Sequence, residues 1–289
     1  MLSDILVSGL VNSGVYALLA LGFSLIFGVA RIVNIAYAGL YMLAAYFVYI
    51  LLNVAGLPAP AAVPLAVVAT VVLGLAVYRL VIEPVREHES AVLISTIALT
   101  LVFQELVLAA FGGNFLGNPV WADGIVAILG VTVTYQQLLS LGVVTLALAA
   151  IWLILTRTRL GVAIRATAND REVANLMGMN VRRVELWSAA LSAALAGIAG
   201  AVGAPLTVID PLMWQGPLVN LLAIVVVGGL GSLKGSLIAA FLIGYVEAAT
   251  VFLLPSGSFL KGAVALTIMV AVLLIRPEGL FGVAFEEER

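Results

Sequence analysis

Cysteine is absent from this sequence, histidine occurs once, and charged residues make up only 10% of it. Without cysteine the chain cannot form disulfides or use thiolate chemistry. The single histidine, His88, lies in a short charged stretch, so we expect neither a Ser/His/Asp catalytic arrangement nor a metal site. The chain also lacks the G-x-x-x-x-G-K-[ST] loop that holds nucleotide phosphates, and no basic surface interleaved with aromatic residues suggests nucleic acid. We therefore expect no enzyme activity and no cofactor bound by this chain.

Hydrophobic residues, in contrast, make up 64% of the sequence, and the mean hydropathy is +1.23. Such a chain has too little polar surface to face water. A helix needs about 20 apolar residues to cross a membrane. The sequence thus predicts an all-α, polytopic membrane protein with one domain (residues 1–289) and eight or nine spans. The predicted spans are 5–30, two within 32–78 that residues 56–60 separate, 91–111, 137–155, 186–206, 218–229, 236–254 and 262–275.

The 13 basic residues predict the orientation of these spans. If the N-terminus lies outside and nine spans alternate, 12 of the 13 face the cytoplasm and only Lys261 faces outside. Cytoplasmic loops of membrane proteins are enriched in lysine and arginine, so we expect an external N-terminus and a cytoplasmic C-terminus. Residues 5–30 follow no basic residue and are long for a signal peptide, which indicates a retained span. Arg31 follows so closely that a full turn and a re-entrant break both stay open.

Two loops differ from short connectors. Residues 112–136 carry no lysine or arginine, as expected outside, and residues 131–135 alternate like a short strand. This loop is either a lid that meets a partner or substrate, or an ordered connector.

In the small-residue sixth span, the spacing of four between Ala189, Ala193, Gly197 and Ala201 predicts close helix packing.

The second unusual loop, at about residues 156–185, holds six arginines and the signature of a short helix. Asn169 is a candidate N-cap with Glu172 three residues later, as in a capping box. Gly178 is a suitable residue to end the helix. The sequence therefore predicts a helix over residues 170–177. Its apolar face consists of Val173, Leu176 and Met177. Such a helix either lies on the lipid interface or docks in a groove of a soluble partner, and composition alone favours the interface.

Four motifs occur in an order that resembles a known family. The segment from Arg171 to Gly178 matches the pattern E-x-A-x3-G at Glu172, Ala174 and Gly178. Residues 28–43 are similar to G-x-x-x-x-x-N-x-A-x-G-x-x-Y-M-L, and residues 228–235 and 276–282 resemble a glycine-rich turn and a closing motif. Together they resemble permease subunits of ATP-binding-cassette importers, and more closely the branched-chain amino acid permeases, over residues 5–282.

The resemblance implies import into a bacterium or archaeon, driven by ATP hydrolysis on other subunits. It implies a second permease subunit, identical or related, two cytoplasmic ATPases that bind ATP and magnesium, and an external substrate-binding protein, all at the plasma membrane. It also favours the docking role for the short helix. The residues implied in ATPase coupling are Asp170, Glu172, Val173, Ala174, Leu176, Met177 and Gly178. Branched-chain amino acids, other amino acids, urea and short amides all stay open as substrates.

Polar residues within the predicted spans are candidates for the substrate path. They are Asn12, Asn34, Gln104, Glu105, Asn220 and Glu247. A charge at the bilayer centre costs at least ~2.5–3.5 kcal/mol on insertion scales, so the two glutamates are the sharpest candidates. Hydrogen bonding between helices is the other interpretation of all six. An alternative function, a proton-coupled transporter that works alone, would use Glu105 and Glu247 as its titrating groups.

Overall fold

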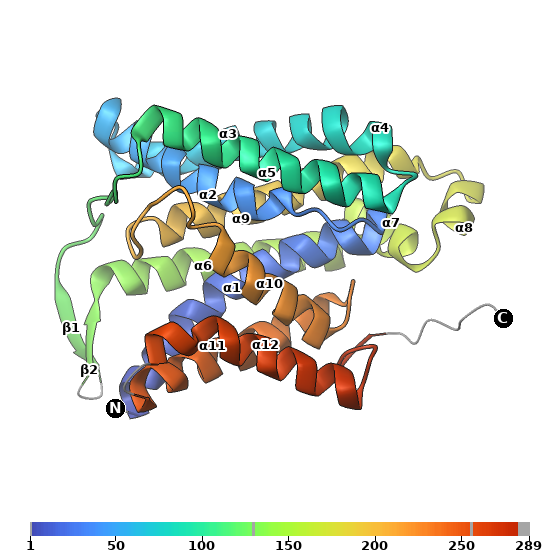
Figure 1. Ribbon diagram of the computed structural model, residues 1–289. Helices are drawn as coiled ribbons and strands as arrows, with labels where there is room; N and C mark the ends of the chain where they lie inside the picture. Colours follow the sequence, from blue (N-terminus) through green and yellow to red (C-terminus); the bar gives the residue numbers. More distant parts are fainter. Residues whose placement is uncertain (1, 129–130, 255–256, 283–289) are drawn as a thin grey trace.

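The computed structural model describes residues 2–128, 131–254 and 257–282, and most of them are helical (Figure 1). This confirms the all-α prediction, with one small two-stranded hairpin added. The long helices are α1 (Leu2–Ala30), α2 (Ala36–Tyr49), α3 (Ala59–Val77), α5 (Glu89–Phe111), α6 (Tyr135–Arg157), α9 (Val181–Gly203), α10 (Gln215–Gly228), α11 (Leu233–Leu253) and α12 (Gly257–Ile275). The short ones are α4 (Glu83–Val85), α7 (Arg159–Asn169) and α8 (Arg171–Leu176).

Seven helical segments of the described chain are long and apolar enough to cross a membrane. Two of them contain π-helical turns: η1 (Ile50–Val54) extends α2, and η2 (Tyr78–Ile82) joins α3 to α4. Helix α10 and the apolar part of α12 are shorter, and the 14 residues of α10 reach only about 21 Å at 1.5 Å per residue. The eight or nine predicted spans therefore correspond to seven full-length candidates and two shorter segments.

The helices run between two ends of the molecule (Figure 1). One, the hairpin end, holds the strands β1 (Ile125–Ile128) and β2 (Val131–Thr134) and the start of α1. The other, the basic end, comprises residues 27–35, 83–89, 157–183, 229–235 and 276–282 and includes α7 and α8. There a side-chain nitrogen of Arg31 donates to the carbonyl oxygen of Ala168 at 3.1 Å. Gly28 also packs against Gly231. The turns predicted to share one membrane side thus gather at one end.

Arg31 lies between α1 and α2 at the basic end, and the choice between a full turn and a re-entrant break stays a prediction. It follows α1 directly and has a φ of +56°, the left-handed region, which among the described non-glycine residues occurs only here. An L-residue in that region costs roughly 1–2 kcal/mol, so the tight reversal between α1 and α2 is held by its surroundings. The contact with Ala168 is one such constraint.

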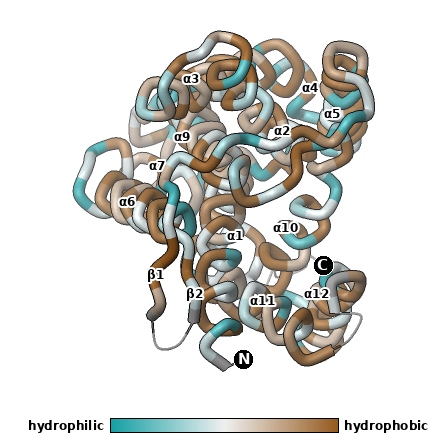
Figure 2. The backbone as a smooth tube through the Cα atoms, turned by 90° about the vertical axis from the view of Figure 1, so that its left-hand side faces the viewer, coloured by the Kyte–Doolittle hydropathy of each residue, from teal (hydrophilic) through white to brown (hydrophobic). Residues whose placement is uncertain are grey.

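Helices α1 and α9 form the centre of the bundle (Figure 2). The predicted small-residue packing of α9 is confirmed. A Cβ atom on Gly200 would lie 2.3 Å from the carbonyl oxygen of Tyr41, and one on Gly74 would lie 2.4 Å from the Cβ of Ala193. Small residues are therefore needed where α9 meets α2 and α3. The outer helices stay apolar toward the outside, as on α5, where Leu101, Val102 and Leu106 are exposed.

The hairpin end is an ordered structure. The two strands pair antiparallel, with Ile125 opposite Thr134, so the predicted strand exists and has a partner that the sequence pattern did not reveal. Thr134 caps α6 in a capping box with Gln137. Leu116 forms an isolated bridge with Ile209, just before α10. The loop thus serves as a connector in this structure, and a lid role stays a prediction.

Candidate functional site

Helices α7 and α8 follow each other through a tight turn and project together at the basic end (Figure 1). Thr158 caps α7 by accepting a hydrogen bond from the amide of Gly161. Asp170 caps α8: its carboxylate accepts the amide of Val173 at 2.9 Å. The sequence prediction placed this cap at Asn169, which is wrong, because Asn169 is the last residue of α7. Helix α8 accordingly covers Arg171–Leu176 rather than residues 170–177.

Sequence reasoning missed α7 altogether. A signal was present, because the buried residues Gly161, Ile164 and Thr167 recur every three positions and Thr158 is a good cap. Gly161 is needed at the start of α7, since a Cβ there would lie 2.3 Å from the carbonyl oxygen of Leu155. This close approach folds α7 directly back on the end of α6.

The predicted apolar face of α8 is exposed. The exposed fractions are 52% for Val173, 84% for Leu176 and 76% for Met177, whereas Ala174 is buried against the rest of the chain. Gly178, with a φ of +81°, ends the helix as predicted, and the amide of Met179 returns to the carbonyl oxygen of Ala174. Three large apolar side chains therefore lie uncovered at the end of the molecule, which is typical of a docking or lipid-contact surface.

The opposite side of α8 is anchored by charge. Arg171, the first residue of α8, lies 2.6 Å from one carboxylate oxygen of the fully buried Glu185 in α9. Arg86, in the turn between α4 and α5, donates to the other oxygen at 2.8 Å, and the hydroxyl of Tyr78 donates to it at 3.1 Å. Sequence reasoning did not single out Glu185. The available signal was an acidic residue beside an arginine-rich loop at the start of an apolar helix.

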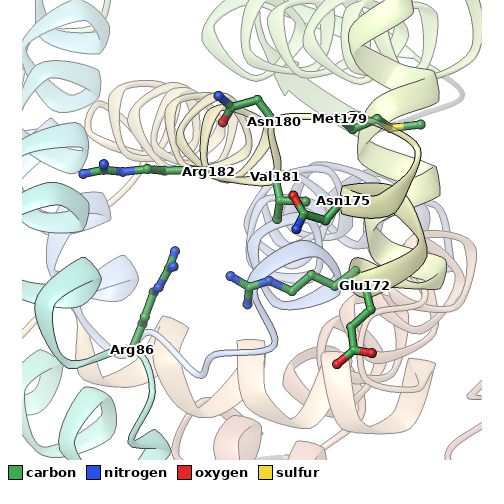
Figure 3. Close-up of a pocket in the computed structure, with 9 residues that line it drawn as sticks. Arg86, Glu172, Asn175, Met179, Asn180, Val181 and Arg182 are labelled. Carbon is green, nitrogen blue, oxygen red and sulfur yellow. The ribbon is translucent and has the colours of Figure 1, made fainter.

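Two of these residues, Arg86 and Arg171, border an open pocket between α8 and the turn before α5 (Figure 3). Arg86 and Arg182 point into it from different elements. Arg182 also forms an ion pair with Glu83 at the more exposed rim. The pocket therefore combines three basic side chains with one exposed carboxylate, that of Glu172. Its lining residues are Arg86, Arg171, Glu172, Asn175, Gly178, Met179, Asn180, Val181 and Arg182.

Within the helical bundle, the structure brings two of the six predicted path residues together through a third residue. The hydroxyl of Tyr16 in α1 donates to Glu247 in α11 at 2.7 Å, and the side-chain amide of Asn220 in α10 donates to that hydroxyl at 2.8 Å. Glu247 and Asn220 are buried, and each keeps one side-chain oxygen without a hydrogen-bond partner in the part of the chain that the structure describes. We call Tyr16, Asn220 and Glu247 the intramembrane cluster. Tyr16 was missed, although it lies one helical turn after Asn12.

The other predicted path residues lie elsewhere. Asn34 lines a small cavity with Tyr37 and Tyr78, and its side-chain oxygen has no hydrogen-bond partner among the described residues. Gln104 accepts a hydrogen bond from the indole of Trp214 at 2.9 Å. Glu105, its neighbour in α5, is exposed on the outside of the bundle, so it does not join Glu247.

Asn12 is partly buried in α1. No described group of three or more histidine, cysteine or acidic side chains is arranged to hold a metal ion.

Comparisons with known proteins agree with one another. The family described as "Branched-chain amino acid transport system / permease component" matches residues 5–273. BraD of Pseudomonas aeruginosa, a high-affinity branched-chain amino acid transport system permease protein, is 29% identical over 96% of this chain and 94% of its own length. LivH of Methanocaldococcus jannaschii, a probable branched-chain amino acid transport permease protein, is 29% identical over 98% of this chain and 93% of its own.

Among solved structures, a chain of PsaBC from Streptococcus pneumoniae in complex with Fab covers 96% of this chain and 94% of its own length. The TM-score is 0.50 and the sequence identity is 16%. This likeness shows that the helical arrangement occurs in another protein, and it bears on the fold alone.

Proposed function

This chain belongs to the family of branched-chain amino acid transport system permease components, and on that premise we propose that it is the membrane-spanning permease subunit of an ATP-driven importer for branched-chain or related small amino acids. The family membership confirms the resemblance seen in the four sequence motifs. The seven long apolar helices and two shorter ones supply a bundle of the size that such a permease needs.

The exposed apolar face of α8 is the observation that carries this proposal. Val173, Leu176 and Met177 form a short ridge on a helix that is anchored from behind by Arg171. A short amphipathic helix of this kind docks its apolar side chains in a groove of a partner. We propose that the groove belongs to a soluble ATPase. The hydrophobic contact would change between ATPase states, and only such a differential contact can shift the permease between conformations.

The proposed complex contains two permease subunits, two ATPases and an external substrate-binding protein. ATP and magnesium would be bound by the ATPases, since the sequence of this chain holds no phosphate-binding loop of the G-x-x-x-x-G-K-[ST] type. Subunit analysis of the purified complex distinguishes a second copy of this chain from a related permease.

The proposed orientation places the basic end in the cytoplasm and the hairpin end outside. The arginines that gather at the basic end support it, because cytoplasmic loops carry an excess of basic residues. The start of α1 then lies outside, and α12 ends inside. In this orientation α8 is within reach of a cytoplasmic ATPase, and the plasma membrane of a bacterium or archaeon is the proposed location.

For the substrate path we propose the intramembrane cluster as its polar contact. An amino acid carries an ammonium group, which donates hydrogen bonds. The side-chain oxygens of Glu247 and Asn220 that lack a partner are suited to accept them. The cluster also joins α1, α10 and α11, so a contact there would respond to movement of these helices.

The test is to place a charge on the docking ridge. We expect Leu176→Glu to abolish substrate uptake and to reduce co-purification of the ATPases, because a carboxylate must be desolvated to enter an apolar groove. Uptake in proteoliposomes and ATPase content of the purified complex are the measurements. Val54→Glu is the matched control: Val54 is a similarly exposed apolar residue, 71% against 84%, in η1 away from the basic end. Wild-type uptake and ATPase binding in Leu176→Glu would contradict the proposal.

A further inference from the structure

Glu185 is a buried carboxylate that side chains from three other elements reach. Its side chain in α9 is 1% exposed. Arg171 reaches it from α8, Arg86 from the turn between α4 and α5, and Tyr78 from η2, at 2.6, 2.8 and 3.1 Å. The two arginine side chains are 42% and 32% exposed, so they remain in contact with solvent while the side chain of Glu185 does not. Glu185 is therefore the common acceptor of a charge network that joins α8 to the spanning helices.

Such a charge network opposes the separation of α8 from α9. A carboxylate this deeply buried is stable as an ion only while cations and hydrogen-bond donors stay beside it. If α8 moved away alone, Glu185 would lose Arg171. The lower-cost response is that α9 and the Arg86 turn follow α8. An apolar contact between the same elements would instead allow sliding, because it has no fixed partner.

The hydroxyl of Tyr78 extends the charge network of Glu185 toward α3. Tyr78 is the first residue of η2, a π-helical turn whose wider hydrogen-bond pattern is typical of functional sites. The same side chain lines the small cavity that holds Asn34, together with Ser192 of α9. A displacement of Tyr78 would therefore change the interior contact between α2, α3 and α9.

We propose that Glu185 is the positioning residue through which movement of α8 is transmitted to α3 and α9. This inference rests on the proposed function, since it assumes that an ATPase moves α8. It assigns the two sides of α8 different tasks: the exposed ridge binds the partner, and Arg171 on the anchored side passes the movement to Glu185. It further implies that the charge of Glu185, rather than its size, matters for coupling.

The experiment compares uptake per ATP hydrolysed in the full transporter, reconstituted with its ATPases and binding protein. Glu185→Gln keeps the shape and an acceptor for Tyr78 but removes the charge that holds the two arginines. We expect uptake per ATP hydrolysed to fall about tenfold, within the range that changes along coupling networks produce, while ATPase co-purification stays at the wild-type level. Retained ATPase binding separates this defect from that of Leu176→Glu.

A second variant keeps the test valid if Glu185→Gln fails to fold. Arg171→Ala removes only the link from α8, at a side chain that is 42% exposed, and should cause the same loss of coupling. Tyr78→Phe should cause a smaller loss. Glu83→Gln is the matched control, because the Glu83–Arg182 ion pair joins α4 to α9 without involving α8. It should leave uptake per ATP hydrolysed unchanged.

The outcomes are distinct. If Glu185→Gln and Arg171→Ala lower the amount of folded complex but leave uptake per ATP hydrolysed at the wild-type value, Glu185 is a structural residue only and the inference is overturned. Equal defects in Glu83→Gln would also overturn it, since any loss of charge at this end would then suffice. If the wild-type chain neither binds ATPases nor imports substrate with them, the proposed function itself fails.

Discussion

Glu185 and Glu247 are both carboxylates with almost no exposed surface, yet their surroundings differ. Glu185 lies at the basic end and has two arginines and a tyrosine hydroxyl beside it. Glu247 lies within α11 and accepts a hydrogen bond from Tyr16, while its other oxygen has no hydrogen-bond partner among the described residues. One oxygen of Glu185 also accepts no hydrogen bond, but a guanidinium nitrogen of Arg171 lies 2.6 Å from it. Among the described residues no ion pair reaches the corresponding oxygen of Glu247, and this is the difference between the two carboxylates.

The difference indicates what each residue can do. A buried carboxylate that is matched by cations holds its neighbours at fixed positions, and its removal leaves those cations unpaired. A buried carboxylate with a free oxygen costs energy in the folded state, and such groups within membrane spans are commonly functional. We therefore assign Glu185 to transmission and propose Glu247 for substrate contact. Substitutions can separate the two assignments.

The largest effect is expected on stability. Glu185→Ala should lower the free energy of unfolding by about 3–5 kcal/mol, because two hydrogen bonds to a charged carboxylate, from Arg86 and Tyr78, are lost together with the Arg171 ion pair. Glu247→Ala should lower it by only about 1–3 kcal/mol, since a single hydroxyl donor is left unsatisfied. Denaturant unfolding of the purified chain in mixed micelles provides both values. A larger loss of unfolding free energy for Glu247→Ala than for Glu185→Ala would contradict the proposed difference between the two carboxylates.

The second largest effect is expected for Glu247→Gln, and it should appear in transport rather than in stability. Glutamine still accepts the Tyr16 hydrogen bond, so folding should change little, but the negative charge available to an ammonium group is gone. We expect uptake by the assembled transporter to fall about tenfold, as for the loss of one charged hydrogen bond. Tyr16→Phe, which keeps the carboxylate, serves as the companion variant and should reduce uptake less. Wild-type uptake in Glu247→Gln would assign the intramembrane cluster to packing alone.

The smallest effect is expected for Glu105→Gln, which adds a third carboxylate to the comparison. Glu105 is exposed on α5, and surface substitutions usually change stability by less than about 0.5 kcal/mol. We expect uptake and stability to stay near wild type. A proton-coupled transporter working alone would behave differently: the isolated chain would import substrate along a pH gradient, and both Glu105→Gln and Glu247→Gln would abolish that import.

Local chemistry made much of the architecture predictable from sequence. The break at residues 56–60 follows from glycine and proline, and α3 does begin at Ala59. The exposed ridge of α8 follows from the spacing of Val173, Leu176 and Met177. The cap of α8 was misplaced by one residue because Asn169 and Asp170 are both good caps. Only the length of α7, which was not predicted, decides between them.

The charge networks could not be predicted, because they depend on which helices become neighbours. Tyr16 and Glu247 are 231 positions apart, and Arg86 and Glu185 are 99 apart. Periodicity marks the buried face of a helix but does not identify the helix that packs against it. The sequence therefore revealed Glu247 as a polar residue in a span and left both its partner Tyr16 and the importance of Glu185 undetected.

The central claim, that the ridge of α8 faces the cytoplasm and binds an ATPase, has one direct test. Because the chain contains no cysteine, Leu176→Cys would introduce a unique thiol at its most exposed ridge position. A membrane-impermeant thiol reagent should label it in inside-out vesicles and not in right-side-out vesicles, and bound ATPase subunits should protect it. Labelling from the external face, or equal labelling with and without the ATPases, would contradict the account.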